Sequence, residues 1–101
     1  MTRYDSFMKV TQKPWGFEVH IATWNQWRLK LLCVNEDHRT SLQYHTEKEE
    51  FWFFSDGTWR HISPGETHRL NGPITVLEIV RGKDSDIVRL EDDYNRESTD
   101  M

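Results

Sequence analysis

The 101-residue chain has one cysteine, three prolines and no run of apolar residues longer than four. A single cysteine excludes an internal disulfide. Because Cys33 stands in the apolar segment 29–34, we assign it to the hydrophobic core. Nothing in the chain approaches the roughly 18 apolar residues of a membrane-spanning helix or the pattern of a secretory signal. We therefore expect a soluble, cytoplasmic protein with no membrane partner.

The chain also lacks a cluster of basic residues. Its 13 Lys and Arg residues are outnumbered by 17 Asp and Glu residues, which gives a formal net charge of −4 at pH 7. No segment could follow a phosphate backbone, so we do not expect nucleic acid as a partner. Hydrophobic residues make up only 36%, but five Trp and five Phe argue against disorder. A chain of this length forms one domain with a small core, which a bound metal or a second subunit would stabilise.

No helical periodicity extends far enough to predict a helix, whereas short apolar segments between turn residues predict strands. We expect these strands at 17–21, 27–34, 40–45, 51–54, 59–62, 74–80 and 87–90. The aromatic segment 51–54 should be buried on both faces. Residues 13–96 form the predicted domain, residues 1–12 a loose arm or an edge strand, and residues 97–101 a disordered tail. An all-β chain of this kind closes into a small barrel or jelly roll.

A candidate metal site begins with Gln43 and His45. Side chains alternate between the two faces of a strand, so residues two apart point the same way. Leu42 and Tyr44 should then be buried on the opposite face. Gln43 and His45 could therefore hold one ion from a single strand.

Two further ligands come from other segments. Glu50 stands at the start of the next apolar segment, and His68 follows the turn at 64–65. An amide, two imidazoles and one carboxylate form a ligand set that suits one divalent metal ion. Because His68 is distant in sequence, such a site would tie two separate parts of the chain together.

Glu47 is an alternative to Gln43 in this set. Carboxylate oxygens bind divalent metals better than amide oxygens do. Gln43, however, shares a strand face with His45 whatever the bend at 46–48 does, so we expect Gln43 to be the ligand. His20 and His61 are interpreted as ordinary strand residues.

Four pieces of sequence span most of the chain: KPWG (13–16), HRTSLQYHTEKEEFW (38–52), SPGETHRL (63–70) and DIVRLEDDYNR (86–96). Together, and in this order, they resemble the cupin domain of the type II mannose-6-phosphate isomerase family. The resemblance implies a small β-barrel of the double-stranded β-helix type, with one divalent ion (Zn, Mn, Fe, Co or Ni) at its centre. The family's metal positions correspond to Gln43, His45, Glu50 and His68.

The chain is shorter than the family's pattern between the two motifs. Cupins usually carry a hairpin there, but only seven residues separate Asp56 from Pro64. We therefore expect a shortened barrel with an open side. Strand exchange or sheet extension in a homodimer would cover the open edge.

The resemblance implies that the substrate is a sugar or a sugar phosphate and that the reaction is an aldose–ketose isomerisation. Such a reaction needs a base, for which Glu47 and Glu49 are candidates. Arg39, Arg69 and Arg89 are candidates for holding a phosphate, although Arg89 fits a surface ion pair equally well. One alternative is a non-catalytic sugar-binding or regulatory module. A less favoured alternative is an Fe(II)-dependent oxygenase.

Overall fold

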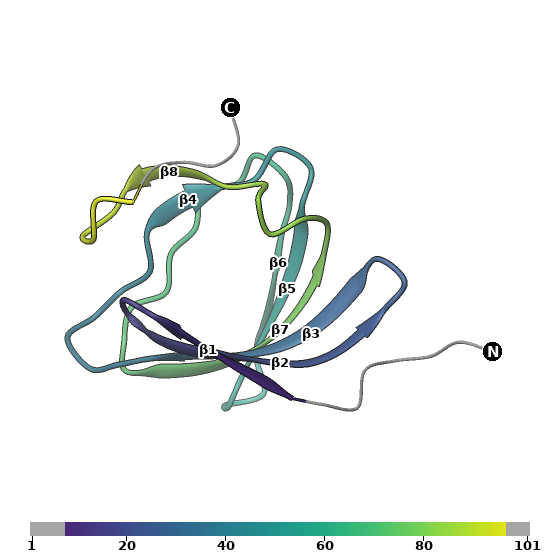
Figure 1. The fold of residues 1–101 in the computed structure, drawn as a ribbon, viewed down its shortest axis with the longest axis horizontal. Helices are drawn as coiled ribbons and strands as arrows, with labels where there is room; N and C mark the ends of the chain where they lie inside the picture. Colours follow the sequence, from purple (N-terminus) through teal and green to yellow (C-terminus); the bar gives the residue numbers. More distant parts are fainter. Residues whose placement is uncertain (1–7, 97–101) are drawn as a thin grey trace.

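The computed structural model describes residues 8–96, and within them the chain is all-β (Figure 1). Every expected strand has a counterpart, and a further strand precedes them. The strands are β1 (Lys9–Lys13), β2 (Gly16–Trp24), β3 (Trp27–Val34), β4 (Leu42–Tyr44), β5 (Glu49–Phe54), β6 (Trp59–Ile62), β7 (Ile74–Arg81) and β8 (Val88–Glu91). Within the described part of the chain, no helix is long and apolar enough to cross a membrane.

The strands form two antiparallel sheets rather than one closed hydrogen-bonded barrel. The larger sheet has six strands in the order β1-β2-β3-β7-β5-β6, and β4 pairs with β8 in the smaller one. Figure 1 shows the small sheet lying across the hollow side of the large sheet. The large sheet is open, with β1 and β6 at its two edges. Part of the expected arm is an edge strand, β1. The expected disordered tail, 97–101, lies outside the described residues.

The face of the large sheet that looks toward the small sheet contains the core. Strand pairing places Leu32 opposite Val76, and Lys30 opposite Glu78, on this inner face. Trp52 lies opposite Glu78 on the neighbouring strand. The apolar part is a cluster of Trp15, Leu32, Val34, Trp52, Ile62, Leu70 and Val76. The inner face therefore changes from apolar to polar along its strands, and the polar part adjoins the candidate site.

Two expectations about burial need correction in the single chain. Cys33 is only half-buried and lies on the outer face of the sheet, where it pairs with Thr75. Strict alternation along β3 explains this, because Leu32 and Val34 take the core positions on either side of it. In the aromatic segment 51–54, Trp52 is buried but Phe53 retains 37% of its surface. Only one face of this segment is covered.

Candidate metal centre

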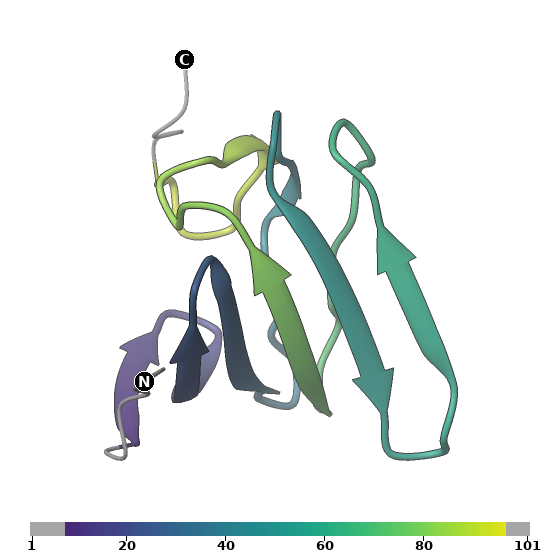
Figure 2. The same cartoon turned by 90° about the vertical axis from the view of Figure 1, so that its right-hand side faces the viewer.

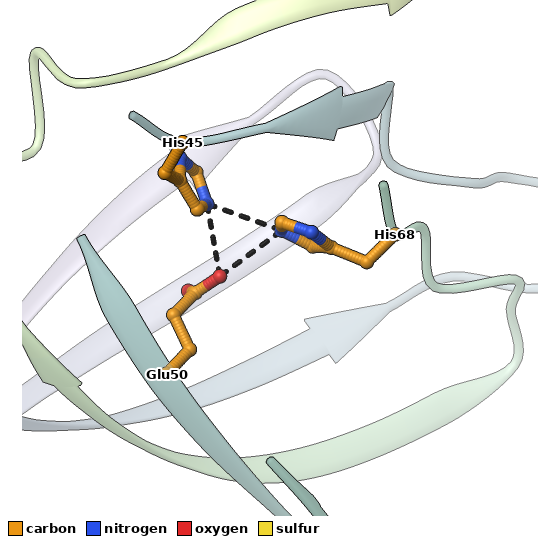
Figure 3. A group of neighbouring side chains, drawn as sticks. All are labelled: His45, Glu50 and His68. Atoms are coloured by element: carbon orange, nitrogen blue, oxygen red, sulfur yellow. Dashed lines mark hydrogen bonds and ion pairs between the residues drawn. The ribbon is translucent and has the colours of Figure 1, made fainter. Parts of the chain in front are cut away.

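Three described residues form the centre, and each comes from a different part of the chain (Figure 3). His45 follows the short strand β4, Glu50 lies in β5, and His68 lies between β6 and β7. Gln43 and His68 exchange two backbone hydrogen bonds of 3.1 and 2.8 Å. This backbone bridge brings the two histidine-bearing segments together, so the pairing of the two sequence motifs has a structural basis.

The three ligand atoms form a nearly equilateral triangle. His45 Nε2 lies 2.9 Å from Glu50 Oε1, His68 Nε2 lies 3.0 Å from the same oxygen, and the two nitrogens are 3.1 Å apart. Neighbouring ligands of a six-coordinate ion at about 2.1 Å lie about 3.0 Å apart, and those of a tetrahedral ion about 3.4 Å apart. The observed separations match one triangular face of a six-coordinate site. This buried group could hold a metal ion.

Backbone carbonyl groups fix the orientation of both imidazoles. His45 Nδ1 lies 2.6 Å from the Asp86 carbonyl oxygen, and His68 Nδ1 lies 2.9 Å from that of Glu66. A carbonyl oxygen only accepts, so each neutral ring carries its proton on Nδ1 and turns the Nε2 lone pair inward. Two lone pairs and a carboxylate oxygen then converge within about 3 Å of one another. Such an arrangement is repulsive unless a proton or a metal cation lies among them.

A second buried carboxyl group supports Glu50. Burial, followed by the charge of Glu50, raises the pKa of Glu78 well above its usual range, so Glu78 is protonated and can donate a hydrogen bond to Glu50. Trp52 Nε1 donates to Glu78 Oε2 at 2.9 Å. Burial opposes ionisation of Glu50, but its close polar partners, Glu78 first, outweigh it and hold the pKa of Glu50 well below its usual range. The centre therefore contains one ionised and one neutral carboxyl group.

The bend between His45 and Glu50 is held by Asp86. Its carboxylate accepts three backbone N–H bonds, from Thr46, Glu47 and Lys48, at 2.7–2.8 Å. These donors, with the Thr46 hydroxyl, outweigh the effect of burial and lower the pKa of Asp86. The same residue offers its carbonyl oxygen to His45. Asp86 thus sets both the ring of one ligand and the backbone that leads to the next.

Gln43 lines the same cavity as the three ligands, and neither Leu42 nor Tyr44 does. This agrees with the expected alternation along β4, although Leu42 and Tyr44 are half-buried rather than fully buried. The Gln43 amide nitrogen lies 3.4 Å from the Ser41 carbonyl oxygen. The amide oxygen is therefore the atom that could bind a cation.

The structure does not bring the proposed catalytic residues to this cavity. Glu47 is exposed in the bend held by Asp86, and Glu49 points to the outer face, where it pairs with His61. The alternation along β5 explains Glu49, because Glu50 takes the inner position. Arg39 makes a two-bonded ion pair with Asp93 near the surface.

Arg69 also lies outside the cavity lining. Its guanidinium group donates to the Thr40 carbonyl oxygen and to Glu91. The arginines that do line the cavity are Arg89 and Arg96. Burial, together with the charge of Arg96, lowers the pKa of Arg89. Arg96 already makes a two-bonded ion pair with Asp92 at 2.9 and 3.1 Å, so an anion at this part of the wall would compete with that carboxylate for Arg96.

The cavity has a volume of about 160 Å³. This is close to the roughly 150 Å³ that accommodates a benzene-sized molecule. A molecule of the size of a hexose phosphate could place only one end inside. Besides the ligand residues, the lining includes Lys13, Trp15, Glu18, Lys30, Ser41, Trp52, Glu78 and Asp84.

Glu78 and Asp86 were not identified from the sequence as site residues, and Arg89 was assigned either to a phosphate or to a surface ion pair. Glu78 is the one charged residue within the otherwise apolar and Thr-containing segment 74–80, and this interruption was a usable signal. Asp86 and Arg89 stand in a segment with several similar charges, so only the fold distinguishes them.

Replacing Asp86 by Ala should weaken metal binding by about 10- to 100-fold, because the bend between His45 and Glu50 loses its four hydrogen bonds. Isothermal titration calorimetry with Mn²⁺ or Ni²⁺ would measure this. Asp56→Ala is a matched control, since Asp56 caps the Thr58 backbone and hydroxyl in a turn without contacting the centre. Affinity within twofold of the wild type for Asp86→Ala would contradict the role given to Asp86.

Glu78→Gln should make the chelator-treated protein more stable above about pH 5. The raised pKa means that the folded state keeps a proton that the unfolded state loses above about pH 4.3, so wild-type stability falls as pH rises, by up to about 1.4 kcal/mol per pH unit. Gln keeps the donor and acceptor but has no such dependence. Urea unfolding between pH 4 and 8 would show two diverging curves that meet below about pH 4.5, whereas parallel curves would be inconsistent with a neutral Glu78.

Comparisons of the chain with protein-family models, with curated proteins and with solved structures found no match. The arguments for the metal centre are therefore its own geometry and chemistry.

Proposed function

We propose that the protein binds one divalent metal ion through His45, Glu50 and His68, with Gln43 as a fourth ligand. The observation that supports this most directly is the convergence of two imidazole lone pairs and one carboxylate at 2.9–3.1 Å. The burial of all three side chains excludes bulk water as the means of relieving their repulsion.

The proposal extends to a shortened cupin. Two facing antiparallel sheets enclose a metal-ligating centre whose residues come from the two sequence motifs, as in the resemblance described above. The order of the motifs and the i, i+2 placement of Gln43 and His45 support the same assignment.

The ligand that we propose is a sugar or a sugar phosphate whose polar end enters the cavity. A bound divalent ion would supply positive charge next to the ligand's oxygen atoms. Arg89 would hold a phosphate or another anionic group, and Trp52 forms an apolar part of the wall. The small volume of the cavity restricts entry to one end of such a molecule.

Aldose–ketose isomerisation is the reaction that follows from the resemblance. It needs a base beside the carbon atoms that exchange a proton. Glu47 and Glu49 lie away from the cavity, so the base would have to be another group in the lining. The lining contains two acidic residues that are accessible to solvent, Glu18, which is half-buried, and Asp84, which is exposed. Sugar binding without turnover is the alternative that needs no base.

A second candidate is an Fe(II)-dependent oxygenase. The observation that favours it is the triangular face formed by two histidines and one carboxylate, a set that suits Fe(II) and O₂. Oxygen uptake by Fe(II)-loaded protein would distinguish it from both sugar-related proposals.

His68→Ala should abolish metal binding and the stabilisation that the metal gives, because His68 is the ligand that joins the second motif to the first. A metal present at a hundred to a thousand times its dissociation constant stabilises the folded state by about 3–4 kcal/mol. Metal content and melting temperature, each with and without chelator, would show the loss. Gln43→Ala should weaken binding, and Glu47→Ala should change it little.

His61→Ala is the control, since His61 pairs with Glu49 on the outer face. Loss of metal in Glu47→Ala but not in His68→Ala would show that the ligand assignment is incorrect. A wild-type protein that holds no metal and shows no chelator effect would remove the basis of the proposal.

Metal-loaded protein should convert mannose 6-phosphate to the ketose phosphate in a coupled assay, and chelator or His68→Ala should abolish the conversion. Arg89→Gln should weaken the interaction with mannose 6-phosphate more than that with mannose, and Arg39→Gln should affect neither. Binding without turnover would favour the regulatory module. If calorimetry detects neither binding nor turnover with metal present, the sugar assignment is incorrect although the metal site stands.

A further inference from the structure

The outer face of the large sheet is apolar across its whole width. One row of paired residues runs over all six strands, with one residue from each of β1, β2, β3, β7, β5 and β6. The row consists of Val10, Val19, Leu31, Leu77, Phe53 and Trp59. A second row beside it contains Leu29, Ile79 and Phe51. An antiparallel sheet with one face in water normally shows polar residues there, and this face does not.

Much of this outer face is exposed in the single chain. Trp59 retains 62% of its surface, Val10 55%, Phe53 37% and Leu77 36%. Figure 2 looks onto the side where β5, β6 and β7 are in front, and no other segment within residues 8–96 crosses it. An exposed apolar patch of this extent marks a surface that binds another protein.

Charged side chains lie at one end of the outer face only. Glu49 and Arg81 are opposite each other and 3.9 Å apart, and Arg81 also stacks on Trp27. The two paired rows contain no charged residue, although 30% of the whole chain is charged. A partner therefore needs an apolar, nearly uncharged surface, and an acidic or a basic partner is not favoured.

We propose that a second copy of this chain covers the outer face, so that two large sheets pack face to face in a homodimer. Six strands that lie about 4.8 Å apart and are about six residues long form a flat area of about 30 by 20 Å, or about 600 Å². Side chains that project from the sheet add to this area. A stable interface of standard size takes about 800 Å² from each partner. The flat area is about three-quarters of that value per partner, and the projecting side chains bring the outer face closer to it. The face also matches itself without requiring complementary charges.

The sheet edges are less suited to this contact. β1 carries Lys9 and Lys13, and β6 carries Arg60. Charged side chains on edge strands discourage the addition of further strands. The dimer expected from the sequence is therefore assigned to the face of the sheet rather than to its open edge.

Leu77→Glu tests the interface at the centre of the longer row. Multi-angle light scattering at micromolar concentration should give about 24 kDa for the wild type, twice the chain mass of 12.2 kDa. The variant should give a single chain mass, because its dimer dissociation constant should rise about a hundredfold or more. Leu90→Glu is a matched control, since Leu90 is 52% exposed on β8 and lies outside the outer face.

Metal binding by Leu77→Glu should equal that of the wild type, which shows that the variant is folded because the centre lies on the inner face. If that variant fails to fold, Trp59→Glu serves instead, since Trp59 is more exposed. A wild-type monomer at 100 µM would overturn the proposal. A folded variant that remains dimeric would also overturn it, because the contact would then lie elsewhere, for example at an edge.

Discussion

The main constraint on the structure is the close approach of three electron-rich atoms, which repel one another and which the fold holds together. Two imidazole nitrogens and a carboxylate oxygen lie 2.9–3.1 Å apart in a buried position. The chain could relieve this repulsion by separating the segments that bear these atoms, but backbone hydrogen bonds hold the two histidine-bearing segments together. A metal cation at this position would remove the repulsion and add three favourable contacts, so metal binding and folding would be coupled.

The residues around the centre also limit the number of unmatched charges there. Glu78 is kept neutral next to an ionised Glu50, which avoids a second negative charge and provides a donor instead. Asp86 is ionised, and its charge is satisfied by backbone N–H groups rather than by the centre itself. Environment alone makes Glu78 an acid and Glu50 and Asp86 carboxylates, since the three carboxyl groups are chemically alike in the unfolded chain.

Sequence alone predicted the all-β class, the strand positions and three residues that the structure brings together. The local rule of alternation accounts only for Gln43 and His45, which it places on one face of a strand wherever that strand lies. Glu50 and His68 were predicted from the order of the sequence motifs. The sequence did not predict where the side chains of Glu49, Arg39 and Arg69 lie. Their surroundings depend on pairing between distant strands and on ion pairs with residues such as Asp93. The role of Glu78 likewise depends on pairing between distant strands, because its hydrogen-bond partner Trp52 is 26 positions away in the sequence.

The two faces of the large sheet show how a metal and a partner would each stabilise this small chain. Eight apolar and eight polar or charged residues are buried among the described residues, so half of the buried positions contribute little hydrophobic stabilisation. The polar half is stabilised only when its charges are matched, which a divalent ion would complete. The apolar residues that would form a second core lie on the outer face, where Phe53 and Leu77 remain in water in a single chain. Packing of two such faces would bury them, so a dimer would supply the hydrophobic stabilisation that the polar half of the inner face does not.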